Sequence, residues 1–273
     1  ANMGNTDVPQ TWDQTTMANL LGTPPNFGFH VQHKGRMWAA GVAAVPSRLY
    51  YSVANNHADW IGAGSGAIDV DTDDGDTIRA LASHKGELLV FKGVSRRSIH
   101  RITGSTPSDF ALVPFIKGVG AVNQQSLIPR GDDLLFWDDM GMHSLVATAA
   151  YGDYVEAYLS APIRTFFTEG LNHTQLPLVW GMNFASQGYV LWTCSRSASS
   201  THDLIIMLDF RFTPPRFAFW PAYRASCLAM VKETNKPTPW YGTYTGTVYR
   251  GHRTSKNLAG AAYAPKMNMR PAT

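Results

Sequence analysis

The stretch with the most evident chemical potential is DVDTDDGD, which begins at Asp69. Asp69, Asp71 and Asp73 alternate as the carboxylates of calcium-binding loops do, and Gly75 permits a tight turn. The register differs from that of a helix–loop–helix calcium site, because a loop counted from Asp69 has aspartate at the sixth position and alanine at the twelfth. Two interpretations stay open, a metal site and a solvated turn with capping carboxylates. We expect the second, with no metal and no cofactor.

The other acidic residues show no arrangement that favours catalysis. Four aspartates bracket the apolar run LLFW, where turn capping is their expected role: Asp132, Asp133, Asp138 and Asp139. Asp209 and Arg211 in LDFRF are expected to form a structural ion pair. The paired carboxylates of a glycosidase are not evident in this pattern.

Histidine, serine and arginine patterns give no stronger site. His30 and His33 in HVQH would point to opposite faces of a strand and could not chelate one ion together. Ser195 lies outside a Gly-x-Ser-x-Gly nucleophile motif. The basic turn SRRS at Ser95 is expected at a solvated hairpin tip, with an acidic partner as the alternative. We therefore predict no enzymatic activity, with no catalytic, cofactor-binding or metal-binding residue.

The elements that carry these residues form a repeat. A glycine turn and a short apolar strand recur about every 50 residues, and each is followed by a second strand. The first strands are GRMWAAG, GELLVFK, GDDLLFW, GYVLW and PWYGTYTG; the second strands are SRLYYS, RSIHRITG, GMHSLVA, HDLIIMLDF and GTVYRG. Further strands are predicted at FALVPFI, RFAFWPA, QSLIPRG and ASCLAMV. The longest connection, which starts at Ala149, is the best place for a short helix.

A hairpin every ~50 residues is typical of β-propeller blades. We predict an all-β propeller of about five or six blades, with an ordinary β-sandwich as the alternative. Five aromatic residues at comparable offsets are expected to pack one blade on the next: Trp38, Phe91, Trp137, Trp192 and Tyr241. The predicted organisation is an N-terminal arm or lead-in strand over residues 1–34, the propeller over 35–251 and a basic C-terminal arm over 252–273.

Composition points to an assembly. Charged residues make up only 16% of the chain, which suggests that neighbouring molecules cover part of its surface. The net charge of +3 is uneven, because Lys236 and five further basic residues follow Glu233 and no acidic residue does. The two cysteines, Cys194 and Cys227, make no disulfide framework, and we expect both to be buried thiols of a reducing compartment. No run approaches the ~18 apolar residues of a membrane anchor.

The order of several motifs resembles the β-propeller proteins of tailed-phage virions, in the tail nozzle and tail-stabilisation group. That group tends to show a Gly-Arg-apolar-Trp strand, a Leu-Tyr-Tyr-Ser strand before Asp-Trp, an Asp-Gly-Asp turn, and basic and apolar strands after it. The matching positions are Gly35 to Trp38, Arg48 to Ser52 with Asp59 and Trp60, Asp74 to Ile78, Leu88 to Lys92, Ser98 to Gly104, and Gly141 to Leu145. The similarity covers roughly residues 24–150 well.

The resemblance implies a structural tail subunit (a nozzle, an adaptor or a stabilisation ring) that forms a closed homo-oligomeric ring, commonly a hexamer, around the DNA channel. Its expected partners are itself, other tail or portal proteins, and genomic DNA through non-specific contacts, in a virion assembled in the host cytoplasm. Apolar anchors for neighbouring subunits are expected in both arms: Trp12, Phe27, Phe29, Tyr263 and Met267. The alternatives are a glycan-binding or glycoside-hydrolysing propeller at the tail tip and a cellular protein-interaction propeller.

Overall fold

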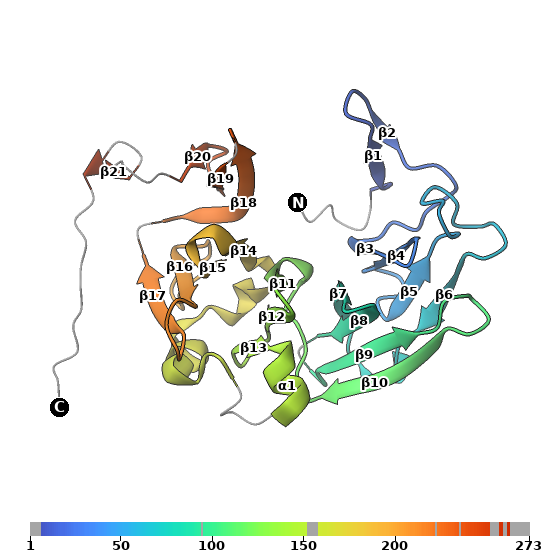
Figure 1. The fold of residues 1–273 in the computed structure, drawn as a ribbon, viewed down its shortest axis with the longest axis horizontal. Helices are drawn as coiled ribbons and strands as arrows, with labels where there is room; N and C mark the ends of the chain where they lie inside the picture. The colour runs from blue at the N-terminus through green and yellow to red at the C-terminus, as the bar shows by residue number, and fades with distance from the viewer. Residues whose placement is uncertain are drawn as a thin grey trace. The chain divides into compact units, whose positions relative to one another are not determined.

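The chain folds into two compact units, Ala1–Val179 (unit 1) and Trp180–Thr273 (unit 2). The computed structural model describes residues 7–93, 95–151, 158–221, 223–234, 236–251, 257–258 and 261–262. Both units are mostly β, and their strands form several small antiparallel sheets, which appear in chain order along the colour ramp of Figure 1. The predicted all-β class is confirmed at this level.

Unit 1 contains a two-stranded ribbon and three larger sheets. The ribbon consists of β1 (Gln10–Trp12) and β2 (Met17–Asn19). The first larger sheet has the strands β3 (Phe29–His33), β4 (Arg36–Ala40), β5 (Arg48–Tyr51) and β6 (Gly66–Asp69). The second has β7 (Ile78–His84), β8 (Glu87–Lys92), β9 (Ser98–Thr103) and β10 (Ala111–Lys117), and the third has β11 (Ile128–Arg130), β12 (Asp133–Trp137) and β13 (Met142–Ser144).

Unit 2 also consists of antiparallel sheets of three or four strands, followed by a short strand pair. One sheet has β14 (Trp180–Phe184), β15 (Tyr189–Cys194), β16 (Leu204–Asp209) and β17 (Arg216–Trp220). The other has β18 (Ala225–Glu233), β19 (Lys236–Thr243) and β20 (Val248–Arg250), and a short pair follows, β21 (Asn257–Leu258) with β22 (Ala261–Ala262). In all five larger sheets each strand pairs with the strand that precedes or follows it in the sequence, so every sheet is a simple antiparallel meander.

All five predicted hairpins are present. They are the pairs β4–β5, β8–β9, β12–β13, β15–β16 and β19–β20. The four additional strands predicted from the sequence also form, as β10, β11, β17 and β18, each beside its expected neighbour. The first sheet begins at Phe29, inside the segment 1–34 that was assigned to an arm or lead-in strand. The predicted C-terminal arm, residues 252–273, lies mostly outside the described residues.

Two of the turns show how the sequence specifies these meanders. Lys34 and Gly35 join β3 to β4 with φ angles of 46° and 70°. Lys85 and Gly86 join β7 to β8 with φ angles of 48° and 80°. A two-residue turn with positive φ at both positions matches the right-handed twist of the strands it joins, and glycine adopts such angles at little cost. The Lys-Gly pair therefore fixes the register of each hairpin.

The core of unit 1 lies between consecutive sheets. Residues from β4 to β9 and the loop after β6 form the Trp38 cluster: Trp38, Ala40, Leu49, Tyr51, Val70, Ile78, Leu81, Leu88, Val90 and Ile102. A second cluster, the Phe91 cluster, lies between the second and third sheets: Ala80, Ala82, Leu89, Phe91, Ile99, Ile116, Val119, Ala121, Leu134, Phe136 and Leu145. In it the ring centroids of Phe91 and Phe136 are 5.2 Å apart. Trp38 and Phe91 thus pack sheet on sheet, as predicted. Fully burying such side chains contributes roughly 1.5–3 kcal/mol each.

The connection after β13 is helical, but the helix begins earlier than predicted. The helix α1 (Leu145–Tyr151) follows β13 directly, and its Leu145 packs in the Phe91 cluster. Short helical turns come after it: Ala161–Ile163, Phe166–Gly170 and His173–Leu178. The other short turns are Thr72–Asp74, Gln124–Ser126 and Ala185–Gln187. None of the helices in the described residues has the length and apolar character to cross a membrane.

The core of unit 2 joins its two larger sheets. Met182, Leu191, Ile205, Ala225 and Leu228 are buried there, and a set of half-buried aromatic residues surrounds them. Cys194 is buried, and burial raises the pKa of its thiol. Cys227 is only half-buried, so the expectation of two buried thiols is wrong for this residue: β18 carries a register shift between Ala225 and Cys227.

Candidate functional site

The acidic loop after β6 holds a lysine ammonium in place of a metal ion. The side chain of Lys92, at the end of β8, is fully buried with 0% exposure. Its Nζ donates to the backbone carbonyls of Val70 at 2.9 Å and Asp71 at 2.7 Å, and to Oδ1 of Asp74 at 2.7 Å. Three oxygens therefore surround one internal cation, as ligand oxygens would surround a metal.

Three of the remaining carboxylates of the loop, those of Asp69, Asp71 and Asp76, also have partners. Asp69 pairs with Arg48 at 2.6 Å, and Oδ2 of Asp71 lies 2.9 Å from Nε2 of His100. Oδ2 of Asp76 accepts the backbone N–H groups of Ser95, Arg96 and Arg97, so the basic turn SRRS surrounds an internal carboxylate. Among the described residues, no group of three or more His, Cys, Asp or Glu side chains could hold a metal ion.

The pKa directions agree with this internal pairing. Burial by itself would raise the pKa of Asp74, but hydrogen bonds from Lys92 and from the Asp76 N–H, with the charges of Lys92 and Arg96, lower it below its usual value. Burial lowers the pKa of His100, and the carboxylate of Asp71 opposes that effect. The loop is thus a group of carboxylates most of which have partners within the fold.

Two of the four aspartates that bracket LLFW, Asp133 and Asp138, accept backbone N–H groups, as predicted. Oδ1 of Asp138 accepts the N–H groups of Met140 and Gly141. Asp133 accepts the N–H of Leu134 and of Val146 in the first turn of α1, where a carboxylate is favourable. Asp139 pairs with Arg97 at 3.1 Å.

The remaining candidates do not meet in one centre. Asp209 and Arg211 form the expected ion pair at 2.6 Å. His33 is buried, with Nδ1 2.9 Å from Oγ of Ser83, whereas His30 is exposed on the same strand, so the two histidines do not share a face. Ser195 is buried.

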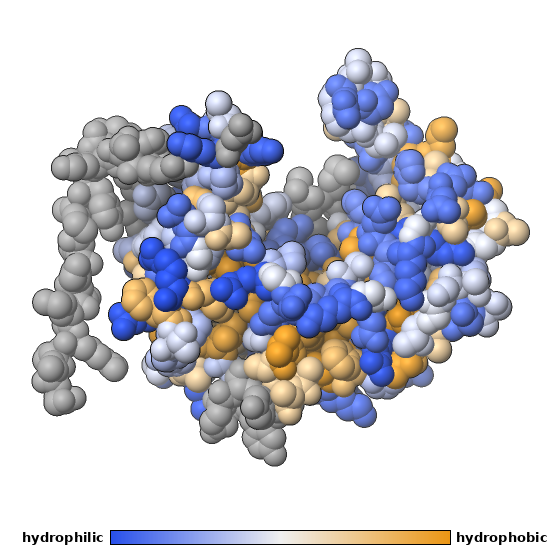
Figure 2. All heavy atoms as spheres, in the orientation of Figure 1, coloured by the Kyte–Doolittle hydropathy of each residue, from blue (hydrophilic) through white to orange (hydrophobic). Residues whose placement is uncertain are grey.

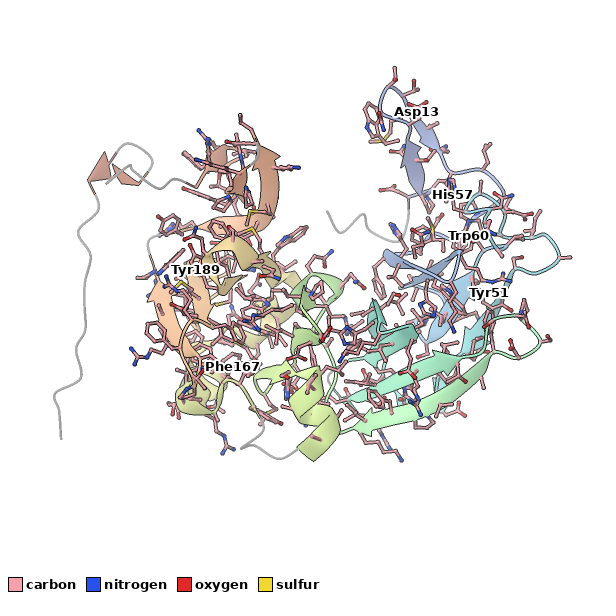
Figure 3. All side chains as sticks on the ribbon, in the orientation of Figure 1. Asp13, Tyr51, His57, Trp60, Phe167 and Tyr189 are labelled. Carbon is pink, nitrogen blue, oxygen red and sulfur yellow. The ribbon has the colours of Figure 1, made fainter. Side chains whose placement is uncertain are left out.

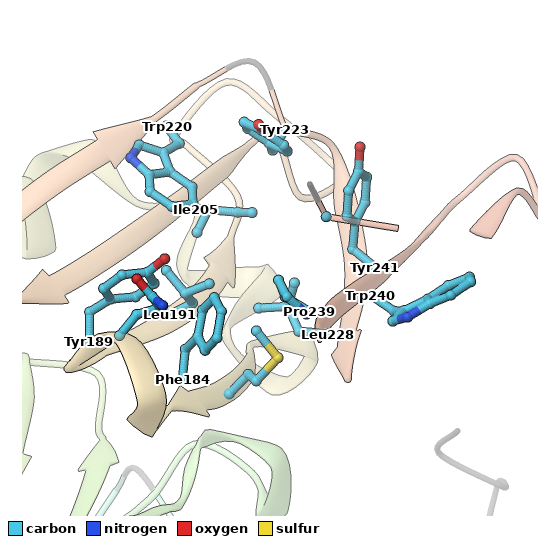
Figure 4. Close-up of a pocket in the computed structure, with 13 residues that line it drawn as sticks. Phe184, Tyr189, Leu191, Ile205, Trp220, Tyr223, Leu228, Pro239, Trp240 and Tyr241 are labelled. Atoms are coloured by element: carbon cyan, nitrogen blue, oxygen red, sulfur yellow. The ribbon is translucent and has the colours of Figure 1, made fainter. Parts of the chain in front are cut away.

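A concave site lined by aromatic residues lies in unit 2 and has a volume of about 370 Å³ (Figure 4). It lies between the sheets β14–β17 and β18–β20. Its lining residues are Met182, Phe184, Gln187, Tyr189, Leu191, Ile205, Trp220, Tyr223, Leu228, Pro239, Trp240, Tyr241 and Gly251. None of these described lining residues is charged, and the volume falls within the range of ligand pockets.

Aromatic rings line this pocket in an unbroken series. The ring centroids of Tyr189 and Trp220 are 6.4 Å apart, those of Trp220 and Tyr223 are 5.7 Å apart, and those of Tyr223 and Tyr241 are 5.7 Å apart. Phe184 extends the series beyond Tyr189 at 5.1 Å. Burial raises the pKa of both Tyr189 and Tyr241 above the usual value, so their hydroxyls stay protonated at neutral pH. The site is therefore suited to an apolar or aromatic group.

The ribbon β1–β2 in unit 1 presents a second apolar feature. Trp12 and Met17 are directly opposite each other across the two strands and are 59% and 61% exposed. Asp13 lies in the turn between them (Figure 3). On the face seen in Figure 2, hydrophobic side chains lie at the surface in several places between hydrophilic ones.

The other predicted anchors in the described residues, Phe27 and Phe29, are not exposed as Trp12 is. Phe27 lies 5.7 Å from the ring of Trp60, and Phe29 packs on the Trp38 cluster, so both contribute to the core of their own unit. Tyr263 and Met267 fall outside the described residues.

Charge divides between the two units. Residues 180–273 contain 11 Lys and Arg against 3 Asp and Glu, whereas residues 1–179 contain 12 against 17. In unit 2 all three acidic residues pair with an arginine: Asp203 with Arg196, Asp209 with Arg211, and Glu233 with Arg250. The positive excess of the described part of unit 2 is carried by Arg216, Arg224, Lys232 and Lys236.

Sequence reasoning found the loop and missed the pocket. Only Tyr241 among the lining residues was singled out, because the others come from six different strands and three connecting segments that the sequence does not bring together. The signal available was the density of aromatic residues at strand ends, as in FAFWPAY.

These features define an all-β protein built from consecutive antiparallel meanders. No protein-family model matches the chain, and a search of curated proteins finds no relative.

Proposed function

We propose that the chain is a structural subunit of a tailed-phage tail, a propeller of five or six blades that joins other copies in a closed ring around the DNA channel. The observation that carries this proposal is the succession of five meanders of three or four strands. Sheets of this kind bury both faces only by packing on one another, and within each unit consecutive sheets share a core cluster.

Three further observations support a structural role. The acidic loop, the feature most suggestive of catalysis or metal binding, has its carboxylates Asp74 and Asp71 paired with Lys92 and His100 inside the fold. Trp12 and Met17 are exposed in a way that suits contact with a neighbour. The positive excess of unit 2 and the negative excess of unit 1 favour attraction between copies, and a positive surface also suits a DNA channel.

Labelling of intact particles tests the tail assignment. Antibodies against this chain are expected to label the tail of the virus that encodes it, at one position along the tail axis. Antibodies against the major capsid protein, which should label only the head, are the control. Labelling of the head alone, or of no particle although the chain is abundant in infected cells, would contradict the assignment.

The pocket supports one second candidate, a glycan-binding site at the tail tip. Tyr and Trp rings stack on sugars, and Tyr189, Trp220 and Tyr223 form a continuous surface of that kind. Sugar sites also need polar groups that fix orientation, and Gln187 is the one amide among the described lining residues. A glycan array with the purified chain tests this candidate: selective binding lost in Trp220→Ala would support it, and an array without signal would reject it.

A further inference from the structure

The ribbon β1–β2 is held in one shape by its own turn. Oδ1 of Asp13 accepts the backbone N–H groups of Thr15 at 2.9 Å and Thr16 at 2.6 Å, which lowers the pKa of Asp13 and keeps it ionised. The turn places Trp12 opposite Met17. A two-stranded ribbon is marginal by itself, and both side chains gain from burial. The ribbon therefore holds two apolar side chains, Trp12 and Met17, together at the surface, where contact with a partner would bury them.

The pocket of unit 2 has the complementary chemistry. Its described lining is aromatic, aliphatic and uncharged, and Met182 and Leu228 form part of its surface. An apolar cavity of about 150 Å³ already holds benzene, so about 370 Å³ has room for an indole with a thioether beside it. Trp and Met are also residues whose contacts with aromatic rings are favourable.

Charge favours the same pairing. Residues 7–19 carry Asp7 and Asp13 and no lysine or arginine. Lys232 and Lys236 lie on β18 and β19, the two strands that supply Leu228, Pro239, Trp240 and Tyr241 to the pocket, and Arg224 follows Tyr223. The donor segment is therefore acidic, and the strands that build the pocket carry an excess of basic residues, which favours association of two copies.

We propose that the pocket of unit 2 receives Trp12 and Met17 from a second copy of this chain. The donor and the acceptor are different surfaces, so the contact is heterologous, and repetition of such a contact closes a ring when its rotation permits. The inference rests on the proposed self-association and adds the contact that produces it.

Cross-linking between differently marked chains tests this docking. One chain carries Thr15→Cys, at an exposed position in the turn between Trp12 and Met17, and another carries Gln187→Cys, at the exposed edge of the pocket. Both chains carry Cys227→Ser, and Cys194 is buried. The mixture with a short bis-maleimide is expected to give a covalent dimer that neither chain gives alone. Ser197→Cys, exposed beyond the other end of β15, replaces Gln187→Cys as the matched control and is expected to give little product. A mixture that cross-links no better than this control would overturn the docking.

The affinity of self-association gives an independent reading. In sedimentation experiments Trp12→Ala and Gln187→Trp, which fills the pocket entrance, are each expected to raise the dissociation constant about tenfold or more. Leu21→Ala removes a 74% exposed apolar residue outside the ribbon strands, and Ser186→Trp adds an indole beside the pocket-lining position. Both controls are expected to stay within about twofold of the parent, because neither changes the docked groups.

Each outcome has a distinct meaning. Oligomers that form equally well in Trp12→Ala and Gln187→Trp would overturn the docking and leave the proposed function intact. A chain that is monomeric at all concentrations would overturn both. Cross-links that arise only in a chain that carries both cysteines would place the ribbon in its own pocket and overturn the contact between copies. Recovery of a glycan or lipid from the pocket, together with unchanged association in the variants, would assign the pocket to that ligand.

Discussion

The acidic loop of unit 1 and the aromatic pocket of unit 2 differ in how far the fold satisfies its own groups. In the loop, Lys92 is fully buried and its ammonium has three oxygen partners, while Asp71 and Asp76 have partners of their own. In the pocket, aromatic rings contact one another along one side and leave about 370 Å³ between them. The residues that look most reactive are therefore the ones already used by the structure.

This difference follows from the cost of burial for each kind of group. A buried charge without a partner costs several kcal/mol, so the fold supplies Lys92 with carbonyls and a carboxylate. Half-exposed aromatic residues cost little while the chain is alone and become favourable when an apolar partner covers them. The loop thus stabilises the fold, whereas the pocket leaves apolar surface that a partner could cover.

The largest effect is expected from removal of the buried ammonium. Lys92→Met keeps the apolar stem and leaves Asp74 and two carbonyls without their donor, which should lower the free energy of unfolding by about 3–5 kcal/mol. Urea denaturation followed by tryptophan fluorescence measures this. Lys117→Met, at an exposed position of β10, is the control and should change stability by less than about 0.5 kcal/mol. Equal effects of both substitutions would show that the loop does not depend on Lys92.

Truncation of one tryptophan in each unit gives the next comparison. Trp38→Ala, in the core beside the loop, should cost about 3–5 kcal/mol. Trp220→Ala, at the edge of the pocket, should cost about 1–2 kcal/mol, because this ring is half-exposed and loses fewer contacts. The same denaturation assay measures both. A larger cost for Trp220 than for Trp38 would mean that the pocket is a closed core.

The pH dependence of stability tests the role of the loop. The pKa of Asp74 is lowered in the fold, so its ionised form contributes stability above the unfolded pKa of about 4, and that stability is lost as the pH falls through the lower folded pKa. Asp74→Asn is expected to be less stable than the parent at pH 7 and to lose less on acidification to pH 3. Parallel curves for the two proteins between pH 7 and pH 3 would contradict this account of the loop.

Calcium should have the smallest effect. Because Lys92 occupies the centre of the loop, millimolar calcium is expected to leave the unfolding temperature within about 1 °C of its value in chelator. Magnesium at the same concentration is the control for ionic strength. A rise of several degrees specific to calcium would restore the metal-loop interpretation.

Much of the fold could be read from the sequence, because its signals are local. Gly35 and Gly86 mark turns, and the apolar bursts that follow them mark strands, so the hairpins β4–β5 and β8–β9 could be predicted by position. The helix after β13 was expected later, since the first residues of α1 read as a continuation of the strand.

The candidate site could be predicted only in part, because its contacts are non-local. The carboxylates of the loop were visible in the sequence, but Lys92 approaches them from the end of a different strand, and no spacing rule indicates that contact. The rings of Tyr189, Trp220 and Tyr241 belong to three strands of two sheets, so their convergence depends on how those sheets pack. Half-buried aromatics have the same sequence signature as core aromatics.

Particle images of the purified chain test the central claim most directly, namely that consecutive meanders and unfilled apolar surfaces together drive assembly. Electron-microscopy class averages are expected to show closed rings with one rotational symmetry and a central opening, and Gln187→Trp should yield mostly single subunits. Class averages that show only isolated particles at every concentration, for the parent as for the variant, would contradict the claim.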